Sequence, residues 1–213
     1  MTTLLLIRHG ESEANRQNIF AGQIDPELQN RGVAQAELTA KYIVENYKVD
    51  KIYSSDLKRA YKTAKCLGDL LGMEVIADQR LREIDGGKWE GENYLHLLDK
   101  YPVEFGNWIN HIGKAFCPDG ESVIQLGERM MDVLTEIAQN NDGKTVAIGT
   151  HAASIRVAQS IVQTGGLKDM ENVPWVSNAS VTVLTYDNGK WDVPVVSEDK
   201  HLADLKTELP KSV

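Results

Sequence analysis

The sequence predicts an α/β fold with three layers, in which helices cover both faces of a mixed, mainly parallel sheet. Short apolar runs alternate with longer amphipathic segments, which is the order of strands and helices in parallel βαβ units. Two of the apolar runs, 3–8 and 145–149, end just before a histidine. An Asn188-Gly189 pair divides residues 180–196 into a hairpin, whose antiparallel strands make the sheet mixed.

Strands and helices alternate through the first part of the chain. Residues 3–8 form the first predicted strand, and Gly10 is expected to let the chain turn sharply after it. A helix is predicted over 31–47, and a short strand at 51–53 leads into a second helix that ends at Gly72. The side chains that identify these helices are Ala34, Leu38 and Tyr42 in the first, and Leu57, Ala60, Ala64, Leu67 and Leu71 in the second.

The same alternation continues to the hairpin. Residues 73–76 predict an edge strand, and 121–139 predict an amphipathic helix. A buried strand at 145–149 is followed by a helix over 152–164. The inward residues of these two helices are expected to be Val123, Met130, Leu134 and Ile137, and then Ile155, Ala158, Ile161 and Val162.

The size and composition predict a single domain over residues 1–213. Residues from about 91 to 119 are aromatic without a clean period, and we interpret them as a partly helical cap insertion over the strand ends. The net charge of −8 argues against nucleic-acid and membrane-surface partners. Cys66 lies in an apolar helical stripe, where a reduced core thiol is expected, and together with Cys117 it fits no metal or disulfide pattern.

The N-terminal residues lack a basic leader, and Arg8 interrupts their apolar run before it reaches the length of a signal-peptide core. No apolar run approaches the length of a membrane span. The sequence therefore predicts a soluble, cytoplasmic protein.

The strand-end histidines, His9 and His151, predict one pocket at the carboxyl ends of neighbouring strands. A neutral imidazole can attack phosphorus when one ring nitrogen is aimed and the other is held by a backbone carbonyl. Arg8 offers planar donors matched to phosphate oxygens, and a protonated His151 would add a charge-assisted donor. The helix that begins near Ala152 adds backbone amides, which favour an anion.

Other polar residues permit either a site role or a structural one. Arg59 lies off the apolar stripe of its helix, so spacing alone favours a solvated charge. Glu83 could be a general acid for a leaving alkoxide or a surface glutamate. Asn15 could donate its amide to an anion or cap a turn. His96 and His201 have no partner pattern and are expected at the surface.

Five motifs resemble those of the histidine phosphatase superfamily, and most closely its phosphoglycerate-mutase-like branch. They occur in the expected order from residue 3 to about residue 190, and the ordered set is far more specific than RHG alone. The motifs are RHGE at 8–11, SSDLKRAYKTA at 54–64, LREIDGGKWEG at 81–91, PDGES at 118–122, and Thr-His with two small residues at 150–153.

The resemblance implies a phosphoglycerate-mutase-like fold, a phosphohistidine intermediate, and no metal or organic cofactor. The site residues it implies are the nucleophile His9, the proton donor Glu83, and the phosphate contacts Arg8, Asn15, Arg59, His151 and Ala152. Three positions depart from the family pattern. Ala152 replaces a common glycine and narrows the pocket, and Gln23 replaces a common aromatic residue near the substrate. Gln29 stands where the family has a small hydroxyl residue, so a local capping effect is expected.

The resemblance implies either of two enzyme classes, and the residues favour a phosphomonoester hydrolase that releases inorganic phosphate from a small phosphorylated metabolite. The alternative is a cofactor-dependent phosphoglycerate mutase. Mutases resemble one another in a longer insertion with paired arginines for the substrate carboxylate, and 91–119 contains no arginine. Candidates to touch the leaving group are Tyr94, Tyr101, Trp108 and His111, each of which could instead be a packing or surface residue.

Two further classes are weaker. A non-catalytic phospho-ligand binding module would lack the nucleophile or the proton donor, and this chain keeps both His9 and Glu83. A metal could be held by the two strand-end histidines and Glu83, but the adjacent arginines would repel it. The sequence leaves the natural substrate, the pathway, residual mutase activity and the oligomeric state open, and it allows a homodimer.

Overall fold

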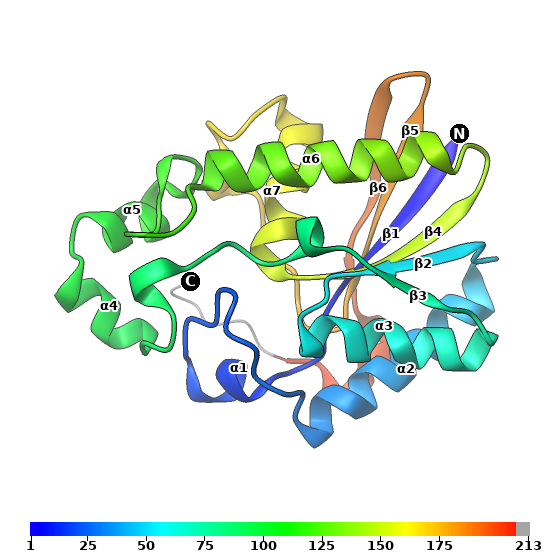
Figure 1. Ribbon diagram of the computed structural model, residues 1–213, viewed down its shortest axis with the longest axis horizontal. Helices are drawn as coiled ribbons and strands as arrows, with labels where there is room; N and C mark the ends of the chain where they lie inside the picture. Colours follow the sequence, from blue (N-terminus) through cyan, green and yellow to red (C-terminus); the bar gives the residue numbers. More distant parts are fainter. Residues whose placement is uncertain (208–213) are drawn as a thin grey trace.

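A sheet of six strands separates two layers of helices in the computed structural model, which describes residues 1–207 (Figure 1). Residues 208–213, the end of the predicted domain, lie outside the described residues. The strands are β1 (Thr2–Arg8), β2 (Lys51–Ser54), β3 (Val75–Ala77), β4 (Thr145–Thr150), β5 (Val181–Asp187) and β6 (Lys190–Glu198). The α-helices are α1 (Glu13–Gln17), α2 (Asn30–Asn46), α3 (Lys58–Leu71), α4 (Tyr94–Lys100), α5 (Glu104–Asn110), α6 (Val123–Asn140) and α7 (Ala152–Thr164).

The strand order β3-β2-β4-β1-β5-β6 confirms the mixed, mainly parallel sheet. β1 pairs in parallel with β4, and β2 lies between β4 and the edge strand β3, also in parallel. β5 runs antiparallel to β1 and forms the predicted hairpin with β6. Asn188 and Gly189 both adopt positive φ in its turn, as a type I′ turn requires.

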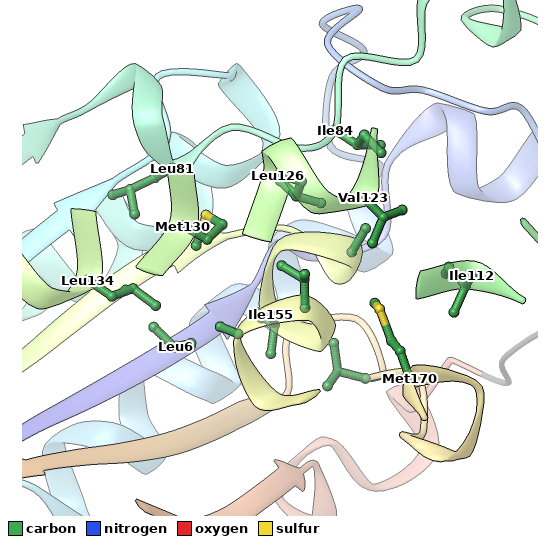
Figure 2. Close-up of a cluster of buried hydrophobic side chains, with 14 of the residues drawn as sticks. Leu6, Leu81, Ile84, Ile112, Val123, Leu126, Met130, Leu134, Ile155 and Met170 are labelled. Carbon is green, nitrogen blue, oxygen red and sulfur yellow. The ribbon is translucent and has the colours of Figure 1, made fainter. Parts of the chain in front are cut away.

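The apolar run of β1 is continuous because both faces of the strand are buried. Leu4 and Leu6 belong to the core under α6 and α7, whereas Leu5 and Ile7 belong to the core under α2 and α3. Successive side chains of a strand point to opposite faces, so one short segment anchors both layers. The first core is visible in Figure 2, where the labelled side chains around Leu6 include Met130, Leu134 and Ile155.

The predicted stripe is buried in α6, and in α3 it is buried except for the half-buried Leu71, but α2 buries a neighbouring face. Its buried residues are Gly32, Gln35, Ala36, Thr39, Ala40 and Ile43, while Ala34, Leu38 and Tyr42 are half-buried. Gln35 accepts a hydrogen bond from the amide of Glu11 at 2.8 Å and donates to the carbonyl of Leu205 at 2.7 Å. The prediction of the buried face of α2 was wrong because it used apolar residues alone. Polar residues such as Gln35, which are buried because they form hydrogen bonds, do not appear in that pattern.

Two expectations about single side chains were wrong. His201 is half-buried, because its ring stacks on Tyr42 with centroids 4.5 Å apart and its Nε2 lies 2.9 Å from the hydroxyl of Thr39. Cys66 is a free thiol, as predicted, but it lies half-buried at the flank of its helix rather than in the core. Cys117 is free and buried.

Helices α4 and α5 lie beyond the end of the sheet at which β1 and β4 finish (Figure 1). The stretch 91–119 is thus partly helical, as predicted, and its aromatic residues Phe105 and Trp108 are buried. Of the helices formed by residues 1–207, none combines the length and the apolar composition that a bilayer crossing needs.

Candidate active site

His9 follows the last residue of β1, and backbone bonds fix it there. Its amide donates to the carbonyl of Thr150 at 3.0 Å, and its own carbonyl accepts from the side-chain amide of Asn178 at 3.1 Å. The ring nitrogen Nδ1 lies 2.7 Å from the carbonyl oxygen of Gly10. Because a carbonyl only accepts, Nδ1 carries the proton, and Nε2 keeps its lone pair. The buried imidazole is therefore held in the tautomer that a nucleophile needs.

Gly10 is needed at this site because the backbone of α2 passes close to it, and not because the chain turns there in an unusual conformation. It does not adopt positive φ. A Cβ at Gly10 would lie 2.2 Å from the carbonyl oxygen of Gly32 on α2, and a Cβ at Gly32 would lie 2.1 Å from the carbonyl oxygen of Glu11. The two glycines therefore let α2 press against the loop that holds His9, and the expected role of Gly10 in a sharp turn was wrong.

His151 lies beside His9 because β4 is the neighbour of β1, with Arg8 in register with Thr150. The two rings are 5.2 Å apart between centroids and meet edge to face. Nε2 of His151 lies 2.8 Å from the hydroxyl oxygen of Ser55, which also accepts from the amide of Leu57 at 3.3 Å. The hydroxyl proton of Ser55 then goes to Nε2, which assigns the ring proton of His151 to Nδ1.

Both imidazoles are neutral near pH 7. Burial, and next the charge of Arg59, hold the pKa of His9 well below its ordinary value of 6.5, and the same two causes lower the pKa of His151. The expectation of a protonated His151 is therefore replaced by a neutral ring that offers its Nδ1–H. Nδ1 is fully buried and has no partner among residues 1–207.

These buried rings make the fold less stable in acid. The unfolded chain takes up a proton on each ring near pH 6.5, whereas the folded chain does so only at a lower pH. The stability is thus complete above about pH 6.5, and between the two pKa values the free energy of unfolding should fall by about 1.4 kcal/mol per pH unit for each ring. Denaturant titrations at several pH values should show a steeper decline in the wild type than in a His9→Asn/His151→Asn variant. Equal slopes would contradict the lowered pKa values.

Arg8 and Arg59 both line the cavity next to His9. Arg8 Nη1 donates to the carbonyl of Val176 at 2.6 Å, and Arg59 donates through its two Nη atoms to the carbonyls of Ile24 and Gly22, each at 2.7 Å. The Nε atoms of both are buried and have no partner within the described part of the chain. Burial lowers the pKa of Arg8 to about 10, so it stays charged at neutral pH. Arg59 is only 1% exposed, which overturns its interpretation as a solvated charge.

Glu83 also lines the cavity, and the start of α7 holds its carboxylate. Its oxygens accept from the amides of Ala153 at 3.2 Å and Ser154 at 3.3 Å, and from its neighbour Ile84 at 3.0 Å. These helix amides were expected to bind a phosphate, but in the structure they donate hydrogen bonds to Glu83. Ala152 itself lies on the cavity wall.

Asn15 and Asn178 form a pair on the cavity wall. The side-chain oxygen of Asn15 accepts from the amide and the hydroxyl of Ser12 and from Nδ2 of Asn178, at 3.1, 3.0 and 3.1 Å. Because these donors occupy the oxygen, the NH₂ group of Asn15 remains as a donor for an anion. Sequence reasoning missed Asn178, which precedes β5 in an irregular segment without a spacing signal. Ser55 lies within the motif at 54–64, but the sequence assigns it no role of its own.

The site residues surround a cavity of about 150 Å³. Of the seven residues expected at the site, Arg8, His9, Asn15, Arg59, Glu83 and Ala152 line it, and His151 lies directly behind His9. Of the four residues considered for leaving-group contacts, Tyr94 and Trp108 line the cavity. Tyr101 packs against the core and His111 is exposed, so neither of these two lines it. Within residues 1–207, no group of three or more His, Cys, Asp or Glu side chains could hold a metal ion.

Known proteins are similar to this chain in fold and in sequence. The model of the histidine phosphatase superfamily (branch 1) matches residues 4–199. A putative phosphoserine phosphatase 2 of Hydrogenobacter thermophilus is 32% identical over 96% of this chain and 100% of its own length. The structure of YhfR from Bacillus stearothermophilus superposes with a TM-score of 0.88 at 27% identity, over 95% of this chain and all of that one. A variant of the phosphoserine phosphatase of Entamoeba histolytica, in complex with phosphoserine, gives 0.84 at 27% identity over 95% and 100% of the two chains.

Proposed function

The chain belongs to the histidine phosphatase superfamily and is a phosphomonoester hydrolase of that family, and on this premise we propose that it works through a phosphohistidine on His9. Its substrates are small phosphorylated metabolites, as they are for the phosphoserine phosphatases it resembles. No metal takes part. Residues 1–213 act as one domain, and the stretch 91–119 caps the site.

One observation carries this proposal: three neighbours of the neutral His9 each have a buried N–H group without a partner within residues 1–207. The groups are Nε of Arg8, Nε of Arg59 and Nδ1 of His151, none of which has an acceptor among the described residues. A buried donor without a partner in the protein needs an acceptor from outside it, and phosphate oxygens carry the charge that matches two guanidiniums. Phosphate in this position would touch the lone pair of His9 Nε2.

In the first step, Nε2 of His9 attacks phosphorus in line with the ester oxygen. The N–P bond forms as the P–O bond to the alcohol breaks, and Glu83 gives its proton to the leaving oxygen. Arg8 and Arg59 stabilise the charge on the equatorial oxygens, with neutral His151 as a further donor.

In the second step, Glu83 takes a proton from a water molecule as that water attacks the phosphohistidine. The N–P bond breaks, inorganic phosphate leaves, and the lone pair returns to Nε2. The hydrogen bond from Nδ1 to the carbonyl of Gly10 keeps the imidazole oriented through both steps. The amides of Ala153 and Ser154 fix the Glu83 carboxyl between the leaving oxygen and the water.

A metal-free panel of phosphomonoesters tests this function. The panel includes 3-phosphoglycerate, with and without 2,3-bisphosphoglycerate, and both phosphate release and isomerisation are measured. We expect phosphate release from several esters, unaffected by a chelator and competitively inhibited by vanadate. Fast isomerisation of 3-phosphoglycerate with little phosphate release would identify a mutase instead. Loss of hydrolysis on chelation would identify a metal-dependent hydrolase.

Replacement of Glu83 by glutamine tests its role as the proton donor while the other site residues stay unchanged. Glutamine keeps the shape of the side chain but has no acidic proton. The rate of hydrolysis should therefore fall most for esters with a strongly basic leaving group. We expect Glu83→Gln to slow methyl phosphate about 100-fold or more, and p-nitrophenyl phosphate by less than about tenfold. Comparison of kcat for the two esters measures this difference, and equal losses would contradict the role as an acid.

A further inference from the structure

We infer that the leaving-group side of the cavity selects an uncharged aromatic or aliphatic alcohol, so that the preferred substrates carry no carboxylate on the alcohol. The inference rests on the proposed function and specifies its substrate class. Two of the named relatives are phosphoserine phosphatases, and the alcohol of phosphoserine does carry a carboxylate. In this chain, the only cations on the cavity wall within residues 1–207 are Arg8 and Arg59, which flank His9.

Four aromatic side chains line the cavity in addition to Arg8 and Arg59. We call them the aromatic wall: Phe20, Tyr94, Trp108 and Trp175, all of which line the cavity. Consecutive ring centroids lie 5.5 Å apart for Tyr94 and Phe20, 5.3 Å for Phe20 and Trp108, and 6.0 Å for Trp108 and Trp175. The rings come from four separate segments and form one connected, mainly apolar surface. Its one buried N–H without an acceptor among residues 1–207 is the indole Nε1 of Trp108. Such a surface favours an apolar leaving group.

Arg156 supports the aromatic wall and is not available to a substrate. Its guanidinium carbon lies 4.3 Å from the centre of the Trp175 ring, within the range of a cation–π contact. It donates to the carbonyls of Val173 at 2.7 Å and Met170 at 3.0 Å, and it is buried without lining the cavity. This cation therefore fixes a ring of the wall instead of binding a carboxylate.

The charges in the cavity disfavour a second anionic group. With both imidazoles neutral, the two guanidiniums supply two positive charges, which a phosphate dianion already balances. A carboxylate on the alcohol would add a further negative charge next to aromatic rings, and no third Lys or Arg lines the cavity within residues 1–207. The nearby Arg82 cannot offset it, because its guanidinium is bound to Asp56 at 2.5 and 2.6 Å.

The size of the cavity suits one ring in addition to phosphate. A water molecule needs about 10 to 15 Å³ of cavity volume. The cavity of about 150 Å³ therefore holds about ten water-sized atoms, and phosphate takes the place of about half of them. The remainder matches a phenyl group or a short alkyl chain. Phosphoserine would fit equally well by size, so the discrimination depends on polarity.

Metal-free kcat/KM values for primary-alcohol esters test the inference. Benzyl phosphate should exceed O-phospho-L-serine and 3-phosphoglycerate by about tenfold or more, since one aromatic contact and one unpaired charge each change binding by roughly that factor. A matched pair isolates the charge: 3-phosphooxypropanamide should exceed 3-phosphooxypropanoate about tenfold. Preference for either carboxylate-bearing ester while phosphate is still released would overturn this inference alone. Failure to hydrolyse any ester would overturn the proposed function as well.

Variants of the aromatic wall provide an independent readout. Trp175→Ala should lower the ratio of kcat/KM for benzyl phosphate to that for methyl phosphate about tenfold, through the KM of benzyl phosphate. Trp175→Phe should keep most of the wild-type ratio. It replaces Trp175→Ala as the test variant if the alanine variant does not fold. The matched control is Trp191→Ala, which removes an indole that packs on Tyr186 and does not line the cavity. An unchanged ratio in a folded Trp175 variant would overturn the role of the wall.

Discussion

His9→Ala should abolish turnover and leave the fold intact. The variant removes the atom that would form the covalent bond to phosphorus, and no second nucleophile among the described residues lies where Nε2 does. We expect kcat/KM to fall by about 10⁴-fold or more for every ester, whatever its leaving group. Phosphate release from p-nitrophenyl phosphate measures the loss, because this ester needs least help from Glu83.

The fold of the His9→Ala variant should survive, since the backbone bonds around residue 9 do not depend on its side chain. Circular dichroism and thermal melting check this. His111→Ala is the matched control, because it removes an exposed imidazole that does not line the cavity, and it should keep activity within about twofold. Retained activity in folded His9→Ala would refute the covalent mechanism.

Arg59→Lys should be the second most damaging change. The guanidinium binds the carbonyls of Gly22 and Ile24 and still presents its buried Nε toward the site, which one ammonium group cannot reproduce. We expect kcat/KM to fall by about 10² to 10³-fold, mainly through kcat, because the lost donor acts on charge that develops in the transition state.

Arg82→Lys is the control for this experiment. Its guanidinium pairs with Asp56 and lines no part of the cavity, so we expect an effect within about threefold. If Arg59→Lys also had so small an effect, Arg59 would be a structural residue and not a phosphate contact.

The sequence predicted those parts of the molecule that depend on apolar periodicity. The runs 3–8 and 145–149 each end just before a histidine, and parallel pairing of β1 with β4 places the centroids of the two rings 5.2 Å apart. The stripe of α6 and the Asn188-Gly189 turn were also identified correctly, because both are local signals that long-range contacts do not change.

Features that depend on long-range polar contacts could not be predicted from the residues alone. The buried face of α2 includes Gln35, which joins the loop after His9 to the segment near Leu205. Glu83 takes the amides at the start of α7, although about seventy residues separate the two in the chain. Asn178 likewise orients Asn15 across the length of the chain. In each case the partner is set by the tertiary fold, which no local pattern reports.

The covalent intermediate is the central claim, and trapping it is the most direct test. Substrate labelled with ³²P is mixed with the enzyme, quenched in alkali, in which a phosphohistidine survives, and the labelled peptide is mapped by mass spectrometry. We predict label on Nε2 of His9 that forms and decays at the rate of turnover, and none in His9→Ala. Label on another residue, or turnover without any labelled enzyme, would contradict the account.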